Sequence, residues 1–165
     1  MLAYFCPVAF RPSTILPRTM DGTFLLLLHS LLRYVLLILL VASIGFSLRG
    51  VLLKTPILVG HRAIAIWTVT TAHLQLVLGL ILYIMRNWYV ADHTTRIGRF
   101  WKMEHIGMMV IAVILITVGR VLSKKANDEH RKQMHILIFF LIALLLILAA
   151  IPWPFLEVGY GRGWI

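Results

Sequence analysis

The sequence predicts an all-α fold, a four-transmembrane-helix antiparallel bundle, from two observations. First, 61% of the 165 residues are apolar and 13% are charged, whereas soluble domains are roughly 45–50% apolar and about 25% charged. Second, the apolar residues gather in stretches of about 20 residues, the length that a helix needs to cross a bilayer. This composition excludes an ordinary soluble domain, a disordered chain and a collagen-like chain.

The predicted spans differ in their polar content. The first contains one formal charge, Arg33, and the second is the most polar. The third must extend back through Glu104 to be long enough, and the fourth ends at Pro152 and Pro154, which cannot continue a helix. We place the four spans at residues 24–48, 63–85, 104–122 and 135–155.

The flanking segments complete the predicted domain organisation. Residues 22–155 form the four-helix domain, with an N-terminal tail at 1–21 and a C-terminal tail at 156–165. The first tail lacks the pattern of a signal peptide. We expect it to be weakly ordered, or to come from a gene start placed too early, with Met20 as the natural beginning.

The charge balance indicates contact with a lipid bilayer and argues against a nucleic-acid partner. A net charge of +10 is expected where basic loops face anionic headgroups. The loops after the first and third spans carry eight Lys and Arg residues, against seven on the other side, or five if translation begins at Met20. This favours both termini outside. Because Cys6 is the only cysteine, an internal disulfide and a cysteine-based metal cage are excluded.

Histidines at matched depths are the strongest functional signal. His29 and His105 lie near the outer ends of the first and third spans, and His73 lies near the middle of the second. Such side chains within a span normally face the bundle interior and mark a function. A neutral imidazole is well suited to bind haem iron in a dry bundle, especially when its other nitrogen is held by a hydrogen bond. His61 and His135 form a second matched pair near the inner face.

Each of these residues also has a simpler interpretation. His29, His73 and His105 could make hydrogen bonds between helices or relay protons, and His61 and His135 could contact headgroups. Arg33 lies one turn after His29 on the same face, where it could hold a haem propionate. It could equally reach outward to the interface or pair with Glu104.

Other polar and aromatic residues are expected to have structural roles. Thr68, Thr71 and Gln75 share one helical face, opposite His73, and predict a hydrogen-bonded seam with a neighbouring helix. Gly79 permits close helix approach. No nucleophile–base set or phosphate-binding loop is visible, which leaves catalytic residues unknown and the question of an enzyme open. Four aromatic side chains predict an interfacial belt: Trp88, Tyr89, Trp101 and Trp153.

Several segments resemble a family of small four-helix bacterial membrane proteins of the cytochrome b-like type. They are LHSLLRYVLLILLV around His29, HLQLVLGLILY from His73, EHIGMMVIAVILITVGR from Glu104 and ILAAIPWPF before the tail, within residues 22–155. The resemblance implies a haem-facing set of His29, His73, His105 and His135. Leu-Gln-x-x-Leu-Gly at 74–79 is also similar to a span in one half of haem A synthase, although the eight-span organisation of that enzyme is missing here.

We therefore expect a b-type haem protein of the bacterial inner membrane that moves electrons between a donor such as a quinol and a partner subunit. The expected cofactor-binding residues are His29, Arg33, His73, His105 and His135, with His29, His73 and His105 as metal ligands and haem b as cofactor. The alternative is a non-catalytic accessory subunit of a larger membrane complex, or a homo-oligomer. A proton or metal-ion conduit is a third, less favoured alternative.

Overall fold

The computed structural model describes residues 22–159, and this part of the chain contains helices and no strand. Four long helices dominate it: α1 (Thr23–Leu53), α2 (Val59–Met85), α4 (His105–Lys125) and α5 (Glu129–Ala150). Short helical segments connect or follow them: η1 (Trp88–Val90), α3 (Arg96–Arg99), the π-helical turn η2 (Phe100–Glu104) and η3 (Glu157–Gly159). The predicted tail at 1–21 lies outside the described residues, as does 160–165 of the C-terminal tail.

The prediction of four long apolar helices is confirmed. By length and composition, four helical segments could cross a membrane: Thr23–Leu53, Val59–Met85, Arg96–Lys125 and Glu129–Ala150. Several predicted boundaries were wrong. The last helix begins well before residue 135, because the side chain of Asp128 caps it by accepting a hydrogen bond from the Arg131 N–H at 2.9 Å. It ends at Ala150, before the two prolines rather than after them.

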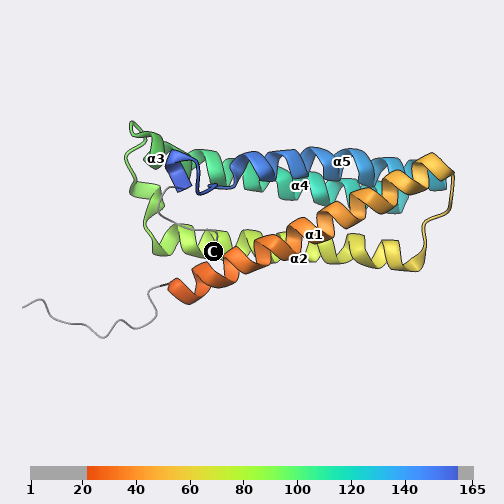
Figure 1. Ribbon diagram of the computed structural model, residues 1–165, viewed down its shortest axis with the longest axis horizontal. Helices are drawn as coiled ribbons and strands as arrows, with labels where there is room; N and C mark the ends of the chain where they lie inside the picture. Colours follow the sequence, from red (N-terminus) through yellow and green to blue (C-terminus); the bar gives the residue numbers. More distant parts are fainter. Residues whose placement is uncertain (1–21, 160–165) are drawn as a thin grey trace, which may run out of the picture.

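The four long helices lie side by side along the long axis of the molecule, and the chain doubles back at each connection (Figure 1). Helix α1 packs against α2 and α5, and α4 packs against the same two helices. Each helix therefore has two neighbours in a closed ring. This arrangement gives the domain one central interior and two distinct ends.

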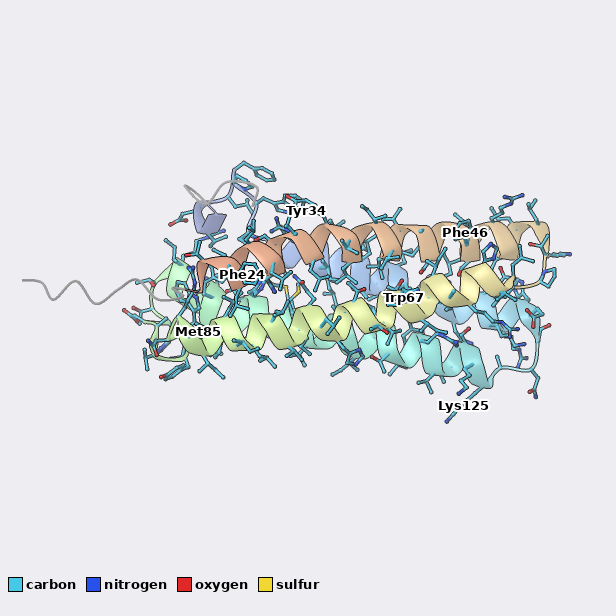
Figure 2. The ribbon with its side chains drawn as sticks, turned by 90° about the horizontal axis from the view of Figure 1, so that it is seen from below. Phe24, Tyr34, Phe46, Trp67, Met85 and Lys125 are labelled. Atoms are coloured by element: carbon cyan, nitrogen blue, oxygen red, sulfur yellow. The ribbon has the colours of Figure 1, made fainter. Side chains whose placement is uncertain are left out.

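The interior is apolar at its middle, while the outer surface is also apolar. Leu40, Ile116 and Phe140 are fully buried and form the centre of the core. On the outside, Phe24 and Trp67 are 70% and 62% exposed (Figure 2). A soluble monomer rarely exposes so much apolar surface, so the exterior fits a lipid environment.

A polar seam joins α1 to α2, as the sequence predicted. Thr68, Thr71 and Gln75 are all buried. The hydroxyls of Ser43 and Thr68 lie 2.9 Å apart, and Thr68 donates to the carbonyl oxygen of Ile64 at 2.8 Å, which leaves Ser43 as the donor to Thr68. The buried hydroxyls of Ser43 and Thr68 thus each have a partner, and this contact helps to set the rotation of α2 about its axis.

The contact between α4 and α5 depends on Gly119. A Cβ atom on Gly119 would lie 2.6 Å from the Cβ of Phe139 and 3.3 Å from the carbonyl oxygen of His135. Both atoms belong to, or sit directly on, the backbone of α5, so they cannot move aside independently. The absence of a side chain at Gly119 therefore determines how closely the two helices approach.

We expect Gly119→Ala to lower the melting temperature of the purified protein, because α4 and α5 must separate. Overpacking of this kind costs about 1–3 kcal/mol of unfolding free energy. Gly107→Ala in the same helix is the matched control, since no atom lies within 4 Å of the added Cβ and alanine favours helix over glycine by roughly 1 kcal/mol. Equal melting temperatures for the two variants would contradict the assigned contact.

Candidate functional site

A cavity of about 420 Å³ opens inside the ring of helices, at the end where α1 begins and α5 ends. Sites for small molecules and cofactors are typically about 300–1,000 Å³. Its walls are mostly Leu, Ile, Val, Met and Ala side chains. The polar and aromatic lining residues are His29, Ser30, Arg33, Gln75, Tyr83, Arg86, Trp88, Trp101 and His105.

His105 reaches the cavity from the first turn of α4 with one ring nitrogen already engaged. Its Nδ1 lies 2.8 Å from the backbone carbonyl oxygen of Ala150 on α5. A carbonyl oxygen can only accept, so Nδ1 carries the hydrogen and donates it. The neutral ring then has its lone pair on Nε2. This is the arrangement by which proteins orient an imidazole that binds a metal.

The carbonyl oxygen of Ala150 is available because of the two prolines that end α5. In a continuing helix it would accept from the N–H of residue 154, but Pro154 has none. Pro152 likewise leaves the carbonyl oxygen of Leu148, which accepts from Nε1 of Trp153 at 2.9 Å. The Ile-Pro-Trp-Pro segment thus ends the helix and also creates the acceptor that holds His105.

Aromatic rings surround His105 where η2 meets α4. The ring centroid of Trp101 lies 5.3 Å from that of His105, and the ring centroid of Phe100 lies 5.8 Å away. Trp88 stacks on Trp101 at 5.4 Å. Phe100 and Trp101 lie within the π-helical turn η2, and such turns often occur at functional sites. The sequence predicted Trp88 and Trp101 only as an interfacial belt, whereas both line the cavity.

His29 enters the cavity from α1 against a glycine of α2. A Cβ atom on Gly79 would lie 3.1 Å from Cε1 of the His29 ring, so the ring occupies the space that a side chain there would fill. Gln75 donates its amide hydrogen to the His29 carbonyl oxygen at 2.9 Å. Nδ1 of His29 is buried without a hydrogen-bond partner among the residues described. A buried polar atom of this kind requires an explanation.

Arg33 lines the same cavity, one helical turn from His29. Its Nη2 donates to the hydroxyl of Tyr34 at 3.1 Å, and its guanidinium carbon lies 4.8 Å from the centre of the Tyr34 ring. Glu104, the alternative partner that the sequence suggested, pairs with Arg99 at 2.8 Å instead. Arg33 thus belongs to the lining of the cavity together with His29.

The structure brings together His29, Arg33 and His105, and it places the other predicted site residues elsewhere. His73 is exposed on the outer face of α2, with Nδ1 2.8 Å from the carbonyl oxygen of Val69. His135 lies near the start of α5, at the other end of the ring. Between residues 22 and 159, no three His, Cys, Asp or Glu side chains are grouped to hold a metal ion.

The predicted set of three histidine ligands is thus not assembled, and helix rotation explains why. The buried residues Ala72 and Gln75 direct one face of α2 inward. His73 follows Ala72 by about 100° of helical rotation and precedes Gln75 by about 200°, so it points outward. The depth of His73 within its predicted span did not reveal that its side chain points outward.

No family model matches the chain, and the comparisons with curated proteins and with solved structures found no match. The function must therefore be inferred from the chemistry of the cavity. That chemistry is two imidazoles, two guanidiniums and an aromatic wall around an apolar volume.

We expect the double variant Pro152→Ala with Pro154→Ala to release His105. With both prolines gone, α5 can continue, and the N–H of residue 154 competes for the Ala150 carbonyl oxygen. In ¹⁵N-histidine spectra of the cofactor-free protein, the His105 ring should change from one Nδ1–H tautomer to a mixture.

The single variant Pro152→Ala is the control, because it restores an N–H only for the Leu148 carbonyl oxygen, which Trp153 uses. It should leave the His105 spectrum as in the original protein. An unchanged tautomer in the double variant would show that the prolines are not the reason for the hydrogen bond.

Proposed function

We propose that the four long helices cross a membrane as an antiparallel bundle and that the cavity binds a b-type haem for electron transfer. The observation that carries this proposal is His105, whose Nδ1–H is bound to Ala150 while Nε2 keeps its lone pair. His29, on a different helix, lines the same cavity. Two imidazoles on separate helices would be suitable ligands for one haem iron in a helical bundle.

The remaining cavity residues fit the same group. A haem is a large, flat, mostly apolar molecule with two carboxylates, and the cavity combines an apolar wall with the guanidiniums of Arg33 and Arg86. Because Nδ1 of His29 has no hydrogen-bond partner among the described residues, a bond from the ring to iron would fix an imidazole that the fold leaves unanchored. When bound, the haem iron would supply reversible one-electron oxidation and reduction.

The chain's own residues would then hold the cofactor and control its surroundings. His29 and His105 bind from opposite helices, with the Ala150 carbonyl fixing the His105 ring. Arg33 and Arg86 neutralise the carboxylates, as bidentate guanidiniums do. Trp88 and Trp101 exclude water from the His105 side, since their rings stack beside it.

The resemblance to cytochrome b-like membrane proteins supports this proposal and suggests its setting. It points to the bacterial inner membrane, a quinol as electron donor and a partner subunit, or a second copy, as acceptor. In the haem-facing set that the resemblance implies, we retain His29 and His105. His73 and His135 are set aside because neither lines the cavity.

We expect the purified protein, produced with ample haem, to show a Soret band and an α-band after reduction. His29→Ala and His105→Ala should each lose most of the bound haem, because each removes one of the two imidazoles that would hold the iron. His73→Ala should keep it, because its side chain faces outward. Haem content per protein, measured by the pyridine haemochrome spectrum, provides the comparison.

Circular dichroism of each variant separates loss of haem from loss of fold. A colourless original protein with intact helices would overturn the haem proposal and favour the accessory-subunit interpretation. Haem loss from His73→Ala equal to that from His105→Ala would contradict the assigned ligands.

We expect Arg33→Leu to retain haem but to lower its midpoint potential, because a positive charge beside the cofactor favours the reduced state. A change of about 1 kcal/mol corresponds to roughly 40 mV for one electron. Arg49→Leu, near the far end of α1, is the charge-matched control and should leave the potential unchanged. A potentiometric titration followed by the α-band tests both variants.

A further inference from the structure

A second, much smaller cavity lies at the opposite end of the helix ring, between the end of α1 and the start of α2. Its volume is about 20 Å³, enough for one or two water-sized atoms. All four long helices contribute to it. Its polar lining residues are Ser43, Ser47, His61, Arg62, Arg120, Ser123 and Gln133.

Two guanidiniums face this small cavity without a carboxylate among the lining residues. Arg62 comes from the first turn of α2, and Arg120 from the last third of α4. Nε of Arg120 is buried and has no hydrogen-bond partner in the described part of the chain. Leaving a charged donor buried and unpaired is expensive, and two like charges beside one cavity add repulsion.

The acidic side chains at this end are engaged elsewhere. Asp128 accepts from the N–H of Arg131, and Glu129 accepts from the N–H of Ile57 at 3.0 Å and from Lys132. Gln133 cannot serve as the missing acceptor, because its Oε1 lies where a Cβ on Gly50 would be. Arg62 interacts electrostatically with the carboxylate of Glu129, but that carboxylate already accepts hydrogen bonds from Ile57 and Lys132. Among the described residues that line the cavity, none is acidic, so Arg120 has no carboxylate beside it there.

The cavity instead offers several hydrogen-bond donors at a strongly basic surface. Ser123 is buried, and the ring of His61 stacks on Phe46 with centroids 4.5 Å apart. In Figure 2, Phe46 and Lys125 lie toward this end of the molecule, far from Phe24 and Met85. Apart from Arg62 and Arg120, the basic residues of this end are Arg49, Lys54, Lys124, Lys125, Arg131 and Lys132.

We propose that the mouth of this cavity binds one phosphate group between Arg62 and Arg120, with a single phosphate oxygen filling the small cavity itself. Guanidiniums with hydroxyl donors suit a phosphate, because their paired N–H groups match two of its oxygens. Basic pockets between helix ends also lie at the depth of lipid headgroups in a spanning bundle. The phosphate belongs either to an anionic lipid or to free phosphate. This site does not depend on the haem proposal.

The test compares the melting temperature of the full-length protein between nanodiscs of different lipid composition, followed by tryptophan fluorescence. Mixed phosphatidylcholine–phosphatidylglycerol should raise it relative to phosphatidylcholine alone. Arg120→Gln should abolish this shift or require at least about tenfold more anionic lipid, because one charged hydrogen-bond donor is lost. Lys124→Gln removes the same charge from an exposed position nearby and should retain the shift.

Inorganic phosphate added to phosphatidylcholine nanodiscs at constant ionic strength identifies the source. If phosphate raises the melting temperature to a plateau and the rise requires Arg120, free phosphate is sufficient as the ligand. If only phosphatidylglycerol raises the melting temperature, the ligand is the lipid headgroup. Arg62→Gln, expected to behave as Arg120→Gln, serves if the latter does not fold. Three results would overturn the proposal. The melting temperature could rise equally with chloride and with phosphate, or it could rise with neither phosphatidylglycerol nor phosphate. Arg120→Gln and Lys124→Gln could also lose the same part of the rise.

Discussion

The hydrogen bond from Nδ1 of His105 to the carbonyl oxygen of Ala150 connects the helix ends with the chemistry of the cavity. It exists because Pro154 leaves that carbonyl without its usual backbone donor. It joins the start of α4 to the end of α5. Without it, the carbonyl oxygen of Ala150 would have no hydrogen-bond donor, because the backbone hydrogen bonds of α5 end there. It also determines which nitrogen of His105 keeps a lone pair, and therefore which atom can bind a ligand.

The ring of four helices gives its two ends different chemistry. One end is wide, with an apolar cavity, two imidazoles and stacked aromatic rings. The other end is narrow, closely packed and basic, with room for an atom or two. The apolar core around Leu40, Ile116 and Phe140 separates them. A cofactor at the wide end and an anion at the narrow end would thus act independently, except through the stability of the bundle.

Much of the candidate site could be predicted from the sequence, but not all of it. His29, Arg33 and His105 were recognisable because polar residues are rare in long apolar stretches. His73 satisfied the same criterion and yet points outward, because the neighbouring buried residues of α2 set the rotation of that helix. Trp88 and Trp101 were assigned to an interface, since nothing in their spacing shows that η2 places Trp101 beside His105 or that Trp88 stacks on Trp101.

The sequence by itself determined that this chain forms four long apolar helices, since hydrophobic length is a local property that needs no knowledge of neighbours. It also showed that Pro152 and Pro154 must stop the last helix, because proline lacks an N–H wherever it stands, although the predicted span ran past them to residue 155 and α5 ends at Ala150. Only the tertiary structure decided which polar residues share a cavity. That outcome depends on how each helix is rotated against two others, and the rotation follows from contacts between distant residues, such as Ser43 with Thr68 and Gly119 with Phe139.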